Sequence, residues 1–146
     1  MSILRIKRSV YDSIRAHGEE AYPYECCGVL LGESTLEGWR VTAAMQAINT
    51  RTDSPHNRYN IAPSELVRIE RVARLQKLEI AGFYHSHPNH PAQWSAIDFA
   101  EAHWLHCSFV ITEVVHGKAA VTNAFLLAGS TEEDKRFEKQ IIQFVD

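Results

Sequence analysis

Three potential metal ligands lie in one short stretch, HSHPNHPAQWSAID, directly after an apolar run at 78–84. His85 and His87 are two residues apart at the end of a predicted strand, so their imidazoles face the same way. Pro88 has no N–H for a sheet ladder and is expected to stop that strand. Asp98 falls on the next predicted helix, from which a carboxylate can supply a third ligand. Two histidines and one carboxylate, with a fourth position left to water, form a common catalytic zinc pattern.

A zinc site of this kind also needs a group that accepts a proton, and Glu25 is the candidate. Zinc lowers the pKa of a bound water to roughly 7, which provides a nucleophile at neutral pH. Glu25 stands at the entrance to the apolar segment CCGVLLG, from which its carboxylate could take the proton and pass it to a leaving amine. Ser95 lies three residues before Asp98, so the two share one face of the first helical turn. Its hydroxyl could stabilise the oxyanion of a tetrahedral intermediate.

Each of these residues also has a purely structural interpretation. A His-x-His pair at a strand end can be a polar cap or a partly buried pair. Ser95 and Asp98 have the spacing of a helix capping box, and a lone glutamate before a strand, such as Glu25, is usually solvated. Cys26 and Cys27 are interpreted as small buried core residues rather than ligands. The joint arrangement, H-x-H-P followed by S-x-x-D, favours the metal site over these separate interpretations.

Apolar periodicity and turn residues predict the elements that position this site. Strands are predicted at 2–6, 27–31, 39–49, 78–86, 109–115 and 119–127, and helices at 9–22, from Pro63 onward and at 95–104. A polar loop is predicted at 50–57, and the tail at 137–145 fits either a helix or an edge strand. Strands and helices mix irregularly. This favours an α/β or α+β sandwich in which helices flank a central mixed β-sheet.

Length and composition limit the classes of function. The 146 residues have the size of one domain, and 45% hydrophobic with 23% charged residues is ordinary for a soluble protein. The net charge is -3 and no face is obviously basic, so nucleic acid is not an expected partner. No apolar run approaches the roughly 20 residues of a membrane span. The N-terminus has no secretory pattern, and three cysteines make a poor disulfide framework, so a cytoplasmic location is expected. The charge run at 132–136 is expected to be a solvated surface.

The stretches YECCGVLLG and GFYHSHPNHPAQWSAID together resemble the JAMM (MPN+) metalloprotease family, most of all its short, stand-alone bacterial members. The family pattern is a glutamate, a long gap, H-[S/T]-H-P, a short loop and S-x-x-D, and the similarity extends over nearly the whole chain, 1–146. Trp94 departs from it, because many relatives have proline immediately before the serine. The resemblance implies an MPN-type fold with an outline similar to that of cytidine deaminases. It also implies one zinc per chain held by His85, His87 and Asp98, a general base at Glu25 and an oxyanion-assisting hydroxyl at Ser95.

The resemblance implies a zinc-dependent metallopeptidase that hydrolyses amide bonds. Eukaryotic relatives cut isopeptide bonds after the C-terminal Gly-Gly of ubiquitin, and short bacterial relatives act on ubiquitin-like sulfur carriers and release an adduct from their terminal glycines. The expected partner is therefore a ubiquitin-like sulfur-carrier protein with a C-terminal Gly-Gly. Its tail suits a narrow groove, since only glycine passes without side-chain clashes. The tail could also add as a strand to an exposed sheet edge beside the zinc.

Two alternatives come from other functional classes. A non-catalytic MPN scaffold would only assemble partners, but such domains typically lack one or more zinc ligands, and here all are present. A zinc deaminase requires H-x-E with P-C-x-x-C, and the chain has no P-C-x-x-C. Zinc content together with hydrolysis of a carrier–peptide fusion separates the three possibilities.

Overall fold

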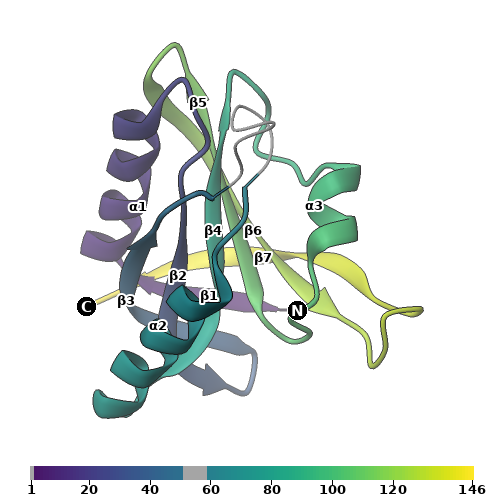
Figure 1. The fold of residues 1–146 in the computed structure, drawn as a ribbon. Coiled ribbons are helices and arrows are strands. Elements are labelled where there is room, and N and C mark those ends of the chain that lie inside the picture. The colour runs from purple at the N-terminus through teal and green to yellow at the C-terminus, as the bar shows by residue number, and fades with distance from the viewer. Residues whose placement is uncertain (1, 51–58) are drawn as a thin grey trace.

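The computed structural model describes residues 2–50 and 59–146, so most of the predicted polar loop at 50–57 lies outside the described residues. None of the described helices is long and apolar enough to cross a membrane. The elements follow one another along the chain as shown in Figure 1: β1 (Ile3–Lys7), α1 (Arg8–Ala21), β2 (Cys27–Thr35), β3 (Gly38–Ala47), α2 (Pro63–Leu75), β4 (Glu79–Pro88), α3 (Ala96–Glu101), β5 (Ser108–Val115), β6 (Lys118–Ala128) and β7 (Arg136–Val145).

The strands close into a barrel in the order β1-β3-β2-β4-β5-β6-β7. β1 pairs in parallel with β7, with Ile6 opposite Phe144, and this pair closes the ring. The mixed α+β class is confirmed, but the closed ring corrects the expected sandwich with a central sheet. The C-terminal tail forms strand β7. It is therefore neither a helix nor an edge strand, because it pairs with β6 on one side and with β1 on the other. Because the pairing partner of the tail is near the other end of the chain, no local pattern reveals it.

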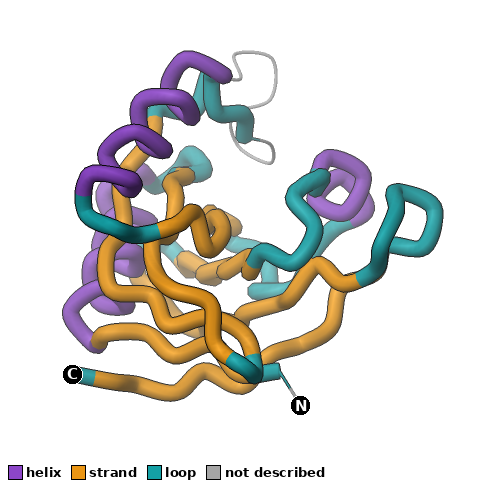
Figure 2. The backbone as a smooth tube through the Cα atoms, turned by 90° about the horizontal axis from the view of Figure 1, so that it is seen from below, coloured by secondary structure: helices purple, strands orange, loops and turns teal. Residues whose placement is uncertain are grey.

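Helix α1 lies directly on the barrel beside the histidine segment. Val10, Ile14 and Gly18 form its buried face. A Cβ at Gly18 would stand 3.1 Å from Cγ2 of Val114 and 3.4 Å from Cβ of Ser86, so glycine permits the close approach of α1 to β4 and β5. Both views show α1 and α3 far apart, with strands between them (Figures 1 and 2), whereas Ile69 of α2 and Phe99 of α3 belong to one core cluster.

Strands β2 and β4 are buried on both faces, which explains their continuous apolar runs. In β2, Val29 packs in the core cluster that contains Ile69 of α2, whereas Leu30 packs in the cluster that contains Ile14 of α1. Ser86 of β4 accepts a hydrogen bond from the backbone N–H of residue 26, at 2.9 Å from its Oγ. The strand ends at Pro88, as its missing N–H predicts. Helix α3 is shorter than the predicted helix at 95–104.

Candidate metal centre

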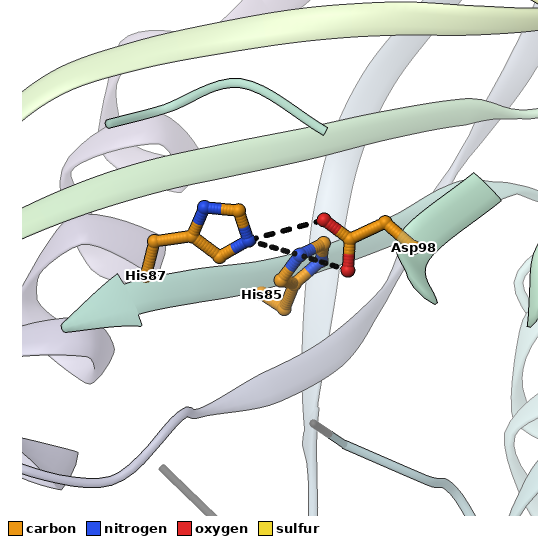
Figure 3. A group of neighbouring side chains, drawn as sticks. All are labelled: His85, His87 and Asp98. Atoms are coloured by element: carbon orange, nitrogen blue, oxygen red, sulfur yellow. Dashed lines mark hydrogen bonds and ion pairs between the residues drawn. The ribbon is translucent and has the colours of Figure 1, made fainter. Parts of the chain in front are cut away.

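His85 and His87 on β4 converge with Asp98 on α3 (Figure 3). Nε2 of His85 lies 3.3 Å from Oδ1 of Asp98, and Nε2 of His87 lies 3.1 Å from Oδ2. The two Nε2 atoms are 3.1 Å apart. One potential ligand atom from each residue lies within 4.8 Å of the others, so this group could hold a metal ion. The structure therefore brings together the three ligands that the sequence predicts.

The surroundings of both imidazoles suit metal binding. Nδ1 of His87 donates a hydrogen bond to the carbonyl oxygen of Pro91 at 2.8 Å, so its proton is on Nδ1 and the lone pair of Nε2 points to the cluster. The ring of His85 stacks on Tyr59, with centroids 4.6 Å apart and an interplanar angle of 27°. Imidazole nitrogen and carboxylate oxygen are both ordinary zinc ligands. The donor set therefore fits zinc, and the hydrogen bond from His87 to Pro91 need not change.

Electrostatics place His85 and Asp98 in the protonation states that a metal needs, whereas in the metal-free protein they favour the charged form of His87. Burial is the main cause that lowers the pKa of His85, so its imidazole is neutral. Burial alone would raise the pKa of Asp98, but its contacts with His85 and His87 outweigh burial and hold the pKa well below the usual range. Asp98 is therefore a carboxylate at neutral pH. For His87, burial lowers the pKa, and the contacts with Asp98 and Pro91 outweigh it and leave the pKa raised.

Glu25 lies beside this cluster, as the sequence predicts, but it is not solvated. It immediately precedes Cys26 and β2, is 4% exposed, and its Oε1 has no hydrogen-bond partner within the described residues. Burial, followed by the negative charges of Asp98 and Glu101, raises its pKa to about 9. A buried carboxyl without a partner costs stability and is typical of a functional group. Glu25 lines one cavity together with His87 and Ser95.

The raised pKa of Glu25 predicts that the stability of the metal-free protein depends on pH. Below pH 4.5 both the folded and the unfolded chain hold this proton. Between about 4.5 and 9 the unfolded chain releases it and the folded chain keeps it, so stability falls as pH rises. Glu25→Gln removes this titration. We therefore expect the free energy of unfolding of the variant to rise relative to that of wild type by at most about 1.4 kcal/mol per pH unit within this window. Denaturant unfolding of both metal-free proteins at several pH values inside the window measures the difference; a constant difference would contradict the burial of a titrating carboxyl.

Ser95 has the predicted capping role and also faces the cavity. Its backbone N–H donates to Oδ2 of Asp98 at 2.9 Å, and the N–H of Asp98 donates to Oγ of Ser95 at 3.0 Å. This capping box begins α3 and fixes the aspartate that faces the histidines. Ser95 also lines the cavity that contains Glu25. Capping and a role toward substrate are therefore compatible in geometry.

Two cavities adjoin the cluster and meet at Ile97, which lines both. The Trp104 cavity has a volume of about 120 Å³ and is lined by Asp98, Ile97, Trp104 and residues of α2, β4 and the segment at 59–61. The Trp94 cavity has a volume of about 400 Å³ and is lined by Glu25, His87, His90, Pro91, Gln93, Trp94, Ser95 and Ile97.

Lys135 is a supporting residue that the sequence analysis missed, since the charge run at 132–136 was expected to be solvated. Its side chain is only 5% exposed and pairs with Glu132. Nζ donates to the carbonyl oxygens of Phe99 at 3.0 Å and Ala102 at 2.8 Å, at the C-terminal end of α3. A cation at this end satisfies carbonyls that the helix leaves open. Lys135 and the capping box therefore hold the Asp98 helix at both ends.

We expect Lys135→Met to weaken metal binding without removing a ligand. Loss of the ammonium frees the end of α3, so Asp98 is held less firmly toward the histidines. Supporting residues around metal ligands typically contribute 10–100-fold in affinity, and we expect a loss of about 10-fold. Zinc titration against a competing chelator measures it. Lys139→Met removes an exposed lysine of β7 and serves as the matched control; equal zinc affinity in both variants would refute the role of Lys135.

Comparison with known proteins gives one matching family and two similar proteins. The family model described as prokaryotic homologues of the JAB domain matches residues 7–127. The desampylase of Haloferax volcanii is 36% identical over 107 residues, which are 70% of this chain and 75% of that protein. Tail tip assembly protein K of Escherichia phage N15 is 26% identical over 96 residues, and this match covers 66% of this chain but only 35% of the phage protein.

Two solved structures have the same fold. The solution structure of a Salinibacter ruber protein has a TM-score of 0.73 and 34% identity, over 97% of this chain and 92% of that chain. The solution structure of a Desulfitobacterium hafniense protein has a TM-score of 0.83 over 99% of this chain and 94% of that chain. Its identity is 24%, so this second likeness concerns the fold alone.

Proposed function

The chain belongs to the family of prokaryotic JAB-domain proteins and is a hydrolase, and we propose that it is a zinc-dependent metallopeptidase acting after the C-terminal Gly-Gly of a ubiquitin-like protein. The observation that carries the proposal is the convergence of His85, His87 and Asp98 beside the buried carboxyl of Glu25, whose Oε1 has no hydrogen-bond partner within the described residues. A cluster that served only to stabilise the fold would not explain why a carboxyl is buried beside it. The similarity to the Haloferax desampylase supports a ubiquitin-like conjugate as the substrate. A sulfur carrier as the protein that bears the Gly-Gly tail, and a cytoplasmic location, are part of the proposal.

In this mechanism each residue has a distinct task. His85, His87 and Asp98 would hold zinc, which supplies a Lewis acid and lowers the pKa of water. Glu25 accepts the proton of the attacking water and passes it to the nitrogen that leaves. Glu25 must be a carboxylate to accept this proton. In the metal-free protein burial and two negative charges raise its pKa to about 9, and the positive charge of bound zinc would favour the carboxylate form. Ser95 is positioned in the same cavity to donate its hydroxyl to the oxyanion.

The test uses ubiquitin-like carriers of bacteria and archaea, each joined through its terminal Gly-Gly to a reporter peptide. We expect cleavage immediately after the second glycine, one zinc per chain by elemental analysis, loss of cleavage after chelation and recovery with added zinc. The matched control carries Gly-Val in place of Gly-Gly. Stoichiometric zinc with no cleavage of any conjugate in the panel would refute the peptidase and leave the scaffold alternative.

Ser95→Ala separates capping from oxyanion stabilisation. If the hydroxyl donates to the oxyanion, kcat falls by about 10²-fold with little change in KM, because that bond strengthens only in the transition state. Loss of the cap alone costs about 0.5–2 kcal/mol of stability and leaves kcat nearly intact in the folded fraction. We expect both effects, measured as kcat on a Gly-Gly conjugate beside a thermal melt. A lower melting temperature with unchanged kcat would assign Ser95 to capping alone.

A further inference from the structure

The backbone next to Glu25 is held by side chains from two other segments. The Oε1 atom of Glu25 has no hydrogen-bond partner within the described residues, and a carboxyl that carries a proton between two atoms has to stay available to both. The peptide unit that joins Glu25 to Cys26, in contrast, has a partner at each polar end. Its N–H donates to Oγ of Ser86 at 2.9 Å, and its carbonyl oxygen accepts from Nδ2 of Asn49 at 3.4 Å. These two side chains therefore fix the direction in which the Glu25 side chain leaves the backbone.

Ser86 joins this peptide unit to the strand of the candidate metal ligands. It stands between His85 and His87 on β4, and successive side chains of a strand face opposite ways. Its hydroxyl therefore lies on the face away from the cluster, where a Cβ at Gly18 of α1 would be 3.4 Å from Cβ of Ser86. Ser86 is 1% exposed, and its backbone N–H donates to the carbonyl oxygen of Cys26 at 3.3 Å. One residue thus fastens β4 to the segment that leads into β2.

We propose that Ser86 is a positioning residue for the proposed reaction: its hydroxyl holds the carboxyl of Glu25 beside the group formed by His85, His87 and Asp98, without touching metal or substrate. This inference rests on the proposed function and deepens it by naming the residue that aligns the proton carrier. Because the hydroxyl lies behind the strand, its loss leaves the three ligands in place and displaces Glu25. A misplacement of about 1 Å in a reacting group can lower a rate by about 10²-fold.

Ser108 is a buried serine whose hydroxyl serves the barrel alone, and it provides a matched control. It is 0% exposed on β5, and its Oγ donates to Oε1 of Gln140 on β7 at 2.8 Å. In the register of β4 and β5 it lies opposite Gly82, which precedes the histidines. Ser108→Ala therefore removes a buried, hydrogen-bonded hydroxyl at a point of the barrel where no candidate site residue lies opposite.

The first experiment measures kcat, KM and zinc affinity of Ser86→Ala, Ser86→Thr and Ser108→Ala, with a Gly-Gly conjugate that the zinc-loaded wild type cleaves. We expect Ser86→Ala to lower kcat by about 10- to 100-fold with little change in KM, and to keep its zinc affinity in competition with a chelator. Ser86→Thr retains the hydroxyl and has room for its methyl beside Gly18, so it should recover most of kcat. Ser108→Ala should lower stability and leave kcat of the folded fraction unchanged.

A second pair of variants tests whether Ser86 acts through Glu25. In a Glu25→Gln background, Ser86→Ala should change kcat by no more than about twofold, because the proton carrier that the hydroxyl aligns is already gone. A role in folding alone would lower kcat by the same factor in both backgrounds. Asn49→Ala approaches the same peptide unit from its carbonyl end and replaces Ser86→Ala if that variant fails to fold. Its loss of kcat should be smaller, since its hydrogen bond is longer.

Amide hydrogen exchange provides a readout that needs no substrate. In Ser86→Ala the N–H of Cys26 should exchange about 2- to 10-fold faster than in wild type, whereas the N–H of Val29 within β2 keeps its rate. Unchanged exchange at Cys26, full kcat in Ser86→Ala, or equal losses of kcat in both Glu25 backgrounds would overturn the role of Ser86 and leave the proposed function intact. If the zinc-loaded wild type cleaves no conjugate of any carrier, the proposed function fails and this inference fails with it.

Discussion

Glu25→Gln should retain one zinc per chain and lose about 10²–10⁴-fold in kcat, the range for removal of a general base. The amide has nearly the same shape as the carboxyl but cannot take a proton from water. Since Glu25 is not one of the three ligands that converge at the cluster, zinc affinity should change little. Elemental analysis of the purified variant and kcat on a Gly-Gly conjugate give the two quantities.

Glu33→Gln is the matched control for this experiment. Glu33 is exposed on β2, the strand that Glu25 precedes, so the same change of chemistry there should leave kcat unaltered. A near-normal kcat in Glu25→Gln, with zinc present, would show that another group carries the proton. A large loss of zinc instead would place Glu25 among the ligands.

Asp98→Ala should lower zinc affinity by more than the roughly 100-fold that supporting residues contribute, because it removes a ligand itself. The same change deletes half of the capping box, so we also expect a loss of about 0.5–2 kcal/mol in stability. The fold should survive, since the barrel core is built from apolar residues of β2, β4 and β5 and not from the metal site. Competition with a chelator measures the affinity, and circular dichroism with thermal melting measures the fold.

Two variants on the same helix sharpen this result. Asp98→Asn keeps an oxygen that can accept the capping hydrogen bond but loses the charge, so its stability should stay closer to wild type while zinc binding weakens. Glu101→Gln alters a carboxyl of α3 that is outside the converging group, and its zinc affinity should stay within a few-fold of wild type. Retention of zinc by Asp98→Ala would disprove the three-ligand site.

The parts of the fold that the sequence predicts correctly are those with local causes. Apolar periodicity with an N-terminal Pro63 predicts α2, and His116-Gly117 between two apolar runs predicts the β5–β6 hairpin. The ligand pair is equally local, because positions two apart on a strand always share a face. The expected outline similar to that of cytidine deaminases stays a prediction.

The parts that the sequence does not predict depend on contacts between distant segments. Lys135 meets the end of α3 more than thirty residues away in the chain, and nothing around it in the sequence distinguishes it from a solvated lysine. The same contact helps to explain why α3 ends at Glu101, since the open carbonyls there already have a partner. The burial of Glu25 also depends on distant segments, because the strand that follows it pairs with β4, where Cys27 lies opposite His85.

Closure of the barrel by β1 and β7 has a consequence for the order of folding. The cost in chain entropy of joining two segments grows with the logarithm of their separation, and Ile6 opposite Phe144 is among the most widely separated pairs in the chain. The three converging ligands, in contrast, lie between 85 and 98 and need only a short loop to meet. We therefore expect the histidine strand and its helix to assemble early and the β1–β7 seam late. Until the seam closes, both strands present unpaired backbone groups, and pairing with another copy of the chain competes with completion of the barrel.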